Sequence, residues 1–369
     1  MSMQMEPSNT LDWPTPLALL LLALPVLFFL YFTCRKTSER CPWRPPPSPP
    51  GLPLIGNLHQ LGPLPHRSMH QLARDHGPVM LLRLGRVPAV VVSTPELARE
   101  VMRTRDADCC SRPGSPGPSR LSYGLKDVAF APYGDYWREM RKLFVVEMLR
   151  AKRVQSIWDA REAHDTFLGG VDTSSVTLLW AMSELIRSPR VLAKAQDELR
   201  RVLGRMRRVD PDDLASLSYL KMVVKEALRL HPPATLLLPR ETVRATTIGG
   251  YDVATGTRVF VNVWAIGRDP DSWESPDEFL PERFEGSDVD FAGQHFELVP
   301  FGAGRRACPA IAMGAANVEF CLANLLYCFD WTLPEGMKCE DVSMEEEGGL
   351  SFHRKVPLWL VPLRYKWHD

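Results

Sequence analysis

Short apolar runs and polar turns open the body of the chain, and runs with helical spacing fill most of the rest. Residues 79–84 and 89–93 are rich in Val and Leu and flank a Gly-Arg-Val-Pro turn, which predicts a β-hairpin. Thr94 followed by Pro95 predicts a helix start, and the pattern continues to about Arg103.

Helical spacing dominates the remaining pattern. Apolar residues recur at helical intervals over residues 136–150, 167–186, 196–203 and 219–230, and small residues fill a further helix over 310–328. Residues 251–263 predict a second hairpin with Gly256 in its turn, and the tail 350–363 is strand-like. The pattern predicts a mainly α fold with small β-sheets and no internal repeat.

The first segment has a different character. Residues 17–34 contain no charge and would span roughly 27 Å as a helix, close to the thickness of a bilayer core. A cleavable signal peptide is the alternative, but acidic residues precede the run, basic residues follow it, and no small-x-small site closes it. We therefore expect a membrane anchor whose flanking charges place the body in the cytosol.

A proline-rich stretch follows the anchor. Residues 45–51 read Pro-Pro-Pro-Ser-Pro-Pro-Gly, which favours an extended, semi-rigid spacer, although a proline-rich recognition motif is the alternative. The expected organisation is a luminal N-terminus at 1–16, an anchor at 17–34, a basic and proline-rich hinge at 35–51 and a globular domain at 52–369.

Composition narrows the function classes. The 369 residues carry a formal net charge of zero without a dense basic tract, so no nucleic-acid partner is expected. The eight cysteines form no Cys-x-x-Cys pair, which argues against a disulfide framework or a zinc site and for reduced thiols.

One cysteine stands in a distinctive loop. Residues 301–310 read Phe-Gly-Ala-Gly-Arg-Arg-Ala-Cys-Pro-Ala, in which two glycines let the backbone approach a flat ligand. Arginines beside Cys308 would favour its thiolate and pair with carboxylates. A dinucleotide-binding glycine loop is disfavoured because no strand precedes it. A structural buried cysteine is the simpler alternative.

This loop resembles the heme-binding motif of the cytochrome P450 family, Phe-x-x-Gly-x-Arg-x-Cys-x-Gly. The chain supplies Phe301, Gly304, Arg306 and Cys308, but Ala310 replaces the last glycine. The resemblance implies that Cys308 is the thiolate ligand of the iron of heme b, iron protoporphyrin IX. It is strongest with plant microsomal enzymes of specialised metabolism, those of grasses in particular.

Other motifs support the resemblance. Glu226 and Arg229 match the family's Glu-x-x-Arg, and Arg283 matches a second arginine that joins them in a structural triad. Alone this spacing is weak evidence, since it recurs elsewhere in the chain and is usually a solvated surface pair. Trp137, Arg141 and Arg240 resemble residues that contact the heme propionates.

Residues 169–174 resemble the oxygen-activation motif of the family's distal helix. Two glycines in a helix cost about 1–2 kcal/mol relative to alanine, and space for dioxygen would explain that cost. Asp172 and Thr173 would then relay protons during dioxygen activation. The alternative is an ordinary N-cap, with a helix that starts at Asp172 or Thr173.

The chain is too short for the full family pattern. Arg141 and Thr173 lie about thirty positions apart, roughly 130 residues fewer than in the family, with an apparent junction near 164–165. The fold is therefore expected to be incomplete between the propionate-contacting helix and the distal oxygen-activation helix. The missing segment would include the roof of the substrate pocket, so its loss would uncover apolar faces and open the iron to water.

The resemblance implies a heme-thiolate monooxygenase in the endoplasmic reticulum membrane. Such an enzyme inserts one oxygen atom into a small lipophilic substrate, with electrons from NADPH through NADPH-cytochrome P450 reductase. The gap favours an alternative, a non-catalytic membrane-anchored product of altered splicing, a decayed gene or a faulty gene model. A third hypothesis is a short form that binds the reductase or a full-length relative.

Overall fold

The computed structural model describes residues 24–25, 43–122, 124–149, 168–205, 208–349 and 351–367. The chain divides into two compact units, residues 1–44 and 45–369, and all the elements below belong to the second. The anchor expected at 17–34, except for residues 24 and 25, and the junction expected near 164–165 lie outside the described residues.

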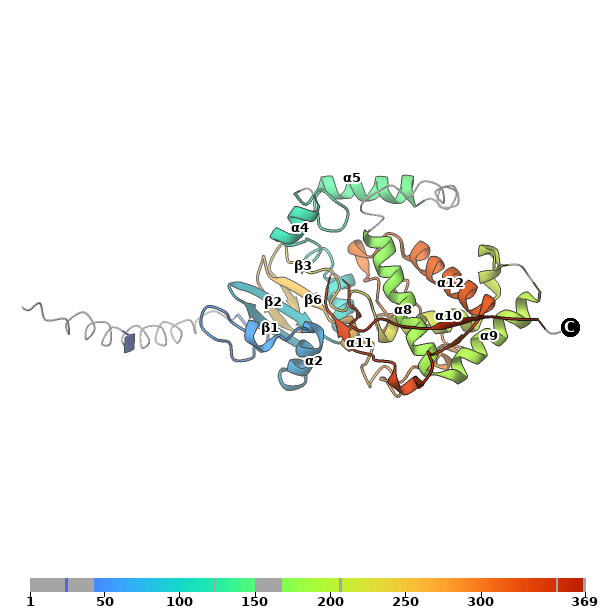
Figure 1. Ribbon diagram of the computed structural model, residues 1–369. Helices are drawn as coiled ribbons and strands as arrows, with labels where there is room; N and C mark the ends of the chain where they lie inside the picture. Colours follow the sequence, from blue (N-terminus) through green and yellow to red (C-terminus); the bar gives the residue numbers. More distant parts are fainter. Residues whose placement is uncertain are drawn as a thin grey trace, which may run out of the picture. The chain divides into compact units, whose positions relative to one another are not determined.

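A four-stranded sheet forms one part of this unit (Figure 1). β1 (Val79–Leu84) and β2 (Val87–Val92) pair antiparallel, which confirms the first predicted hairpin. β6 (Arg258–Val261) runs parallel to β2, and β3 (Arg240–Glu241) pairs with the other edge of β6. The sheet therefore joins segments that lie far apart in the sequence.

The second predicted hairpin, over residues 251–263, is wrong. β5 (Tyr251–Val253) pairs with the preceding strand β4 (Thr246–Ile248), not with β6. The turn is Gly249-Gly250, and both glycines have positive φ, as a tight two-residue hairpin turn requires. Gly256 also has positive φ, but it turns the chain from this hairpin toward the four-stranded sheet.

Four helices pack around the largest hydrophobic core. They are α8 (Thr173–Arg187), α9 (Pro189–Leu203), α10 (Ser218–Leu230) and α12 (Ile311–Cys328), and Figure 1 shows α8 beside α12. All four agree with predicted helices, although α9 begins earlier, at a proline in its first turn.

Shorter elements connect these parts. α3 (Pro95–Arg99) and α5 (Asp135–Leu143) each continue into a π-helical turn, η2 (Glu100–Thr104) and η3 (Phe144–Met148). The sequence pattern missed α2 (Pro65–His76), which packs on the sheet. The other elements are η1 (Leu58–Gln60), α4 (Pro116–Leu121), η5 (Leu168–Asp172), η6 (Pro211–Ser216), α11 (Val263–Ile266), η7 (Pro281–Phe284), η8 (Gly304–Arg306) and η9 (Cys339–Asp341).

The tail is only partly strand. β9 (His353–Arg354) pairs with β8 (Glu346–Glu347), and β10 (Val361–Arg364) pairs with β7 (Phe329–Thr332). Within the described residues, one helix is long and apolar enough to cross a membrane, α12, but its packing against α8, α9 and α10 identifies it as a core helix.

Candidate functional site

The cysteine loop lies between the four-stranded sheet and α12. The backbone N–H of Cys308 donates to the carbonyl of Phe301 at 2.9 Å, which closes the loop. Gly302 and Gly304 have φ of +68° and +70°, a region that favours glycine. A Cβ at Gly304 would overlap the carbonyl oxygen of Met102, so this glycine allows the loop to touch η2.

Ala310, where the chain departs from the family motif, has φ −108° and ψ 30°. This conformation is open to any L-residue, because only a positive φ penalises a side chain strongly. Ala310 directly precedes α12, and its backbone N–H hydrogen-bonds to the Cys308 thiol. The alanine is therefore compatible with the loop conformation.

The sulfur of Cys308 is partly buried. Burial raises the pKa of the Cys308 thiol, while the Ala310 N–H and the positive charge of Arg141 act in the opposite direction. The neighbouring arginines do not act on the sulfur as the sequence suggested, because Arg305 pairs with Asp106 and Arg306 points to backbone carbonyls. Arg141 is the cation that favours the thiolate.

Arg306 and Trp137 form the centre of a buried cationic cluster. The guanidinium of Arg306 lies 4.0 Å from the ring centroid of Trp137 and donates to the carbonyls of Cys110 and Ala131. Its Nη1 is buried and finds no hydrogen-bond partner among the described residues. Burial lowers the pKa of Arg306 to about 10, and the charges of Arg240 and Arg141 act in the same direction.

The other predicted propionate contacts surround this pair. Arg141 donates to the carbonyl of Ala307 at 2.8 Å, and Arg240 donates to Asp106 and to the carbonyl of Ala303, each at 2.8 Å. The indole N–H of Trp137 donates to the carbonyl of Val128 at 2.9 Å. The structure thus brings together side chains from α5, β3 and the cysteine loop.

The sequence reasoning missed a fourth arginine, Arg112. It is buried and donates to the carbonyls of Ala129, Leu238 and Pro239. Burial lowers its pKa well below the usual range, and the charges of Arg240 and Arg306 lower it further. The Ser-Arg-Pro sequence around Arg112 has no helical or strand periodicity, so the sequence gives no sign of its role. Only its burial in the structure identifies it as part of the cluster.

The donor set fits heme. Arg112, Arg141, Arg240 and Arg306 repel one another, and two carboxylates face them, Asp106 on Arg240 and Asp127 near Arg112. Clustered buried cations require anions nearby, and the two propionates of heme b carry two negative charges. The orphaned Nη1 of Arg306 would donate to a propionate carboxylate, and the nearby Cys308 sulfur would bind the iron.

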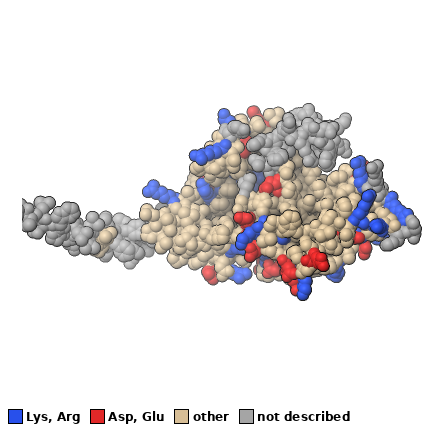
Figure 2. All heavy atoms as spheres, in the orientation of Figure 1, with Lys and Arg blue, Asp and Glu red and all other residues tan. Residues whose placement is uncertain are grey.

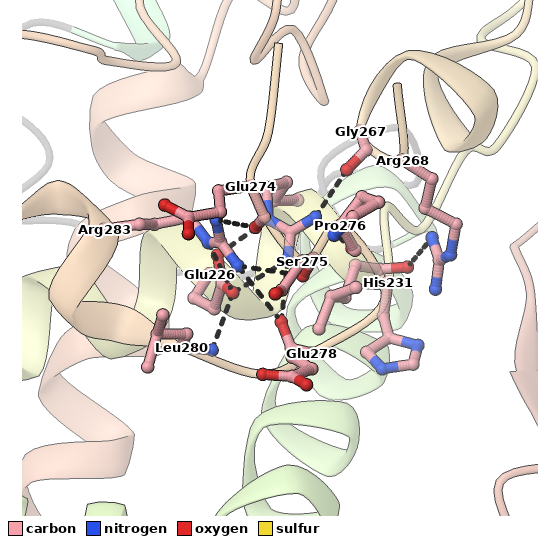
Figure 3. A network of polar contacts seen from close by, with 12 residues as sticks. Glu226, His231, Gly267, Arg268, Glu274, Ser275, Pro276, Glu278, Leu280 and Arg283 are labelled. Carbon is pink, nitrogen blue, oxygen red and sulfur yellow. Dashed lines mark hydrogen bonds and ion pairs between the residues drawn. The ribbon is translucent and has the colours of Figure 1, made fainter. Parts of the chain in front are cut away.

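Glu226 lies in direct contact with Arg229 and Arg283, as the resemblance implied. Figure 3 shows Glu226 and Arg283 side by side in this network. Glu226 is fully buried and accepts two hydrogen bonds from Arg229, at 2.7 and 2.8 Å, and one from Arg283 at 3.0 Å. Arg229 also donates to backbone carbonyls of Gly267, Pro276 and Glu278. The triad therefore ties the end of α10 to the segment before η7.

The distal motif adopts a π-helical turn. η5 runs directly into α8, and Asp172 has φ −62° and ψ −52° inside this continuous helix. The N-cap interpretation of Asp172 is therefore wrong for this chain. A Cβ at Gly170 would meet open space, and π-turns occur frequently at functional sites.

The acid of the motif faces another element. Nε2 of His353 on β9 lies 3.6 Å from Oδ1 of Asp172, and both side chains are more than a third exposed. The hydroxyl of Thr177 donates to the carbonyl of Thr173 at 2.8 Å, one turn along α8. Solvent thus reaches the acid of the motif directly.

Comparisons with known proteins show which family this chain is similar to. The profile of the family described as "Cytochrome P450" matches residues 46–163 and 159–361. The two matches meet close to the expected junction near 164–165. Together they cover most of the chain.

Curated relatives match nearly the whole chain. A 4-hydroxyphenylacetaldehyde oxime monooxygenase of Sorghum bicolor is 45% identical over 511 aligned positions, which cover 96% of each chain. A 2-methylbutanal oxime monooxygenase of Manihot esculenta is 35% identical and covers 96% of this chain and 98% of its own. Because 511 positions exceed the 369 residues of this chain, the Sorghum relative contains a segment without a counterpart here.

Solved structures agree in fold. A zebra fish cytochrome P450 with abiraterone superposes with a TM-score of 0.71, at 22% identity over 82% of this chain and 100% of that chain. A second zebra fish structure, with progesterone, gives a TM-score of 0.67 at 23% identity. These likenesses show the mainly α fold with small sheets.

Proposed function

This chain belongs to the cytochrome P450 family of heme monooxygenases, and we propose that it inserts one oxygen atom from O2 into a small lipophilic substrate. In this proposal NADPH supplies the electrons through a membrane-bound reductase. The observation that carries it is the cysteine loop, in which Cys308 stands beside a cluster of four arginines, three of them buried and the fourth, Arg141, half-buried.

The side chains divide into two groups by what they would hold. Cys308 would bind the iron, and Arg112, Arg141, Arg240 and Arg306 would pair with the two propionates, with Trp137 packed against Arg306. A thiolate-ligated heme supplies the activation of dioxygen. Phe301 and Gly304 would shape the cysteine loop. The triad of Glu226, Arg229 and Arg283 would stabilise the structure that supports this loop and would take no part in the chemistry.

Asp172 and Thr173 would move the protons. Asp172 is exposed at the start of α8, so its carboxylate could take a proton from solvent and pass it to the hydroxyl of Thr173. The same exposure would let water compete at the site, since the segment that would cover it is absent from this chain.

A carbon monoxide difference spectrum of the reduced protein in membranes tests the cofactor site. We expect the red-shifted Soret band of a thiolate-ligated heme, its loss in Cys308→Ala and its retention in Cys339→Ala, which removes a free cysteine of η9. If Cys308→Ala kept the band, Cys308 would not be the ligand.

Relatives suggest the first substrates to test. Two of them are named for 4-hydroxyphenylacetaldehyde oxime and 2-methylbutanal oxime, so we propose a small lipophilic aldoxime for this chain. Turnover should require NADPH and the reductase, and Asp172→Asn should slow it about a hundredfold or more, the lower end of the range for loss of a proton-transfer group. An unchanged rate in Asp172→Asn would exclude the proton relay.

A second candidate function is a non-catalytic product of altered splicing, a decayed gene or a faulty gene model. It is favoured by the two-part family match and by the longer alignment with the Sorghum relative. Heme loading without turnover of any aldoxime would favour it. Sequencing of transcripts gives the complementary test, because a transcript population with only the full-length reading frame would mean that this chain is not made.

We place the protein in the endoplasmic reticulum membrane, with a single span at 17–34, a luminal N-terminus at 1–16, the hinge at 35–51 and the catalytic domain at 52–369 in the cytosol. The uncharged run and the basic residues after it support this orientation. Removal of residues 1–36 should move the protein from sedimented membranes to the soluble fraction, measured by immunoblot. Retention in the membrane fraction would show a second membrane-binding surface.

A further inference from the structure

Asp106 is a buried carboxylate that the proposed chemistry does not use. It lies in the turn after η2 and is 3% exposed. Its Oδ1 accepts a hydrogen bond from Nη1 of Arg240 at 2.8 Å. Its Oδ2 accepts from the backbone N–H of Arg305 at 2.9 Å and from Nη1 of Arg305 at 3.1 Å. One side chain therefore contacts both β3 and the cysteine loop.

The contact between Asp106 and the loop is close because Gly304 has no side chain. A Cβ at Gly304 would lie 2.9 Å from both Cγ and Oδ1 of Asp106 and would overlap the carbonyl of Met102. With φ of +70°, Gly304 turns the next N–H, that of Arg305, toward Oδ2. The acidic side chain and the glycine thus fit each other in shape as well as in hydrogen bonding.

Arg240 is held on two sides. Nη1 donates to Asp106 and Nη2 donates to the carbonyl of Ala303, so the guanidinium bridges the turn and the loop. Arg112 and Arg306 repel it, as their lowered pKa values indicate. Without a carboxylate at position 106, this repulsion would act on Arg240 with no opposing charge in contact.

We propose that Asp106 is a positioning residue, which fixes residues 303–305 of the cysteine loop and the guanidinium of Arg240 in one arrangement. Through the loop it would set the place of the Cys308 sulfur, and through Arg240 the place of one propionate contact. The first part of the proposal, the fixing of residues 303–305 and Arg240, does not depend on heme. The second part, the placing of the Cys308 sulfur and of the propionate contact, rests on the proposed heme site.

The chain offers a matched control two residues away. Asp108 is also buried, at 6% exposed, but it pairs with Arg244 at 2.5 Å and accepts from the hydroxyl of Thr246 at 2.9 Å. Neither partner belongs to the cysteine loop, and neither is Arg240. Asp106→Asn and Asp108→Asn therefore remove the same charge from the same turn with different neighbours.

Hydrogen exchange of the chain without heme tests the first part. In Asp106→Asn, we expect exchange in the peptide 301–309 to accelerate about tenfold, the effect of losing one charge-assisted hydrogen bond. Asp108→Asn should leave that peptide unchanged, and peptides of α10 should stay protected in both variants. Equal exchange of 301–309 in the two variants would overturn the positioning role.

Should Asp106→Asn fail to fold, Arg240→Gln probes the same contact from the other side. It removes the hydrogen bonds to Asp106 and to Ala303, so exchange in peptide 301–309 should again accelerate. Unchanged exchange in this variant would overturn the proposal. These outcomes do not depend on whether the wild-type chain takes up heme.

Heme transfer to apomyoglobin tests the second part on the loaded protein. Asp106→Asn should lose heme about tenfold faster than Asp108→Asn, with a smaller share of the thiolate-type carbon monoxide band. The double variant Asp106→Asn/Arg240→Gln should lose heme more slowly than the product of the two single effects predicts, because part of the effect of Asp106 acts through Arg240. Additive effects would overturn this coupling, and failure of the wild-type chain to load heme would count against the proposed function alone.

Discussion

Two small residues in the cysteine loop differ in what the backbone demands of them. Gly304 has positive φ and touches the turn after η2, so any side chain there meets both strain and overlap. Ala310 has an ordinary conformation at the start of α12. The family motif places glycine at both positions, but in this chain only Gly304 has a conformation that requires it.

Single substitutions of Gly304 and Ala310 test this difference. Gly304→Ala should abolish or sharply reduce the thiolate-type carbon monoxide band, because the loop must move to admit the methyl group. Ala310→Gly should preserve the band and change the free energy of unfolding by less than about 1 kcal/mol. The measurement is the difference spectrum beside urea unfolding, and a normal band in Gly304→Ala would contradict the close packing.

A triad joins elements rather than neighbouring residues. Glu226 and Arg229 belong to α10, but their partners lie in η7, in the segment just before it and at Gly267. Glu96 and Arg99 of α3 have the same spacing and are both exposed. The spacing alone does not distinguish the two pairs, whereas burial does.

Glu226→Gln should therefore lower the free energy of unfolding strongly. It removes the charge that two buried guanidinium groups share, and breaking such a pair costs about 3–5 kcal/mol. Glu96→Gln, with the same spacing on the surface, should change the free energy of unfolding by less than about 0.5 kcal/mol. Chemical unfolding of both variants compares them, and similar small changes would show that the triad is not a structural support.

At the scale of the whole molecule, the expected loss of a segment before the distal motif concerns the apolar surface that the chain exposes. Apolar side chains on η5 and α8 are exposed, among them Val171 at 43% and Leu179 at 43%. Figure 2 shows charged side chains of both signs scattered over one face of the molecule, with wide uncharged areas between them. Exposed apolar surface of this kind favours self-association.

Leu179→Gln should increase the monomeric share of the detergent-solubilised protein and change the free energy of unfolding by less than about 0.5 kcal/mol. Leu185→Gln on the same helix is the control, because Leu185 is fully buried and an amide there should cost about 3 kcal/mol or more. Size-exclusion chromatography and urea unfolding give the two readouts. A large loss of stability in Leu179→Gln would mean that this face is covered in solution.

Local sequence pattern alone predicted many of the elements and motifs of this protein. The hairpin of β1 and β2, the helices α8, α10 and α12, the Cys308 loop and the gap before the distal motif all follow from short-range periodicity, turn residues and motif spacing. Only the tertiary structure decided that β5 pairs with the preceding strand and that one Glu-x-x-Arg pair is buried. It also decided that Arg112 feels the charge of Arg306 and that Asp106 contacts the cysteine loop. The reason is physical, since periodicity reports which face of an element is apolar, while burial and charge contact depend on segments distant in sequence.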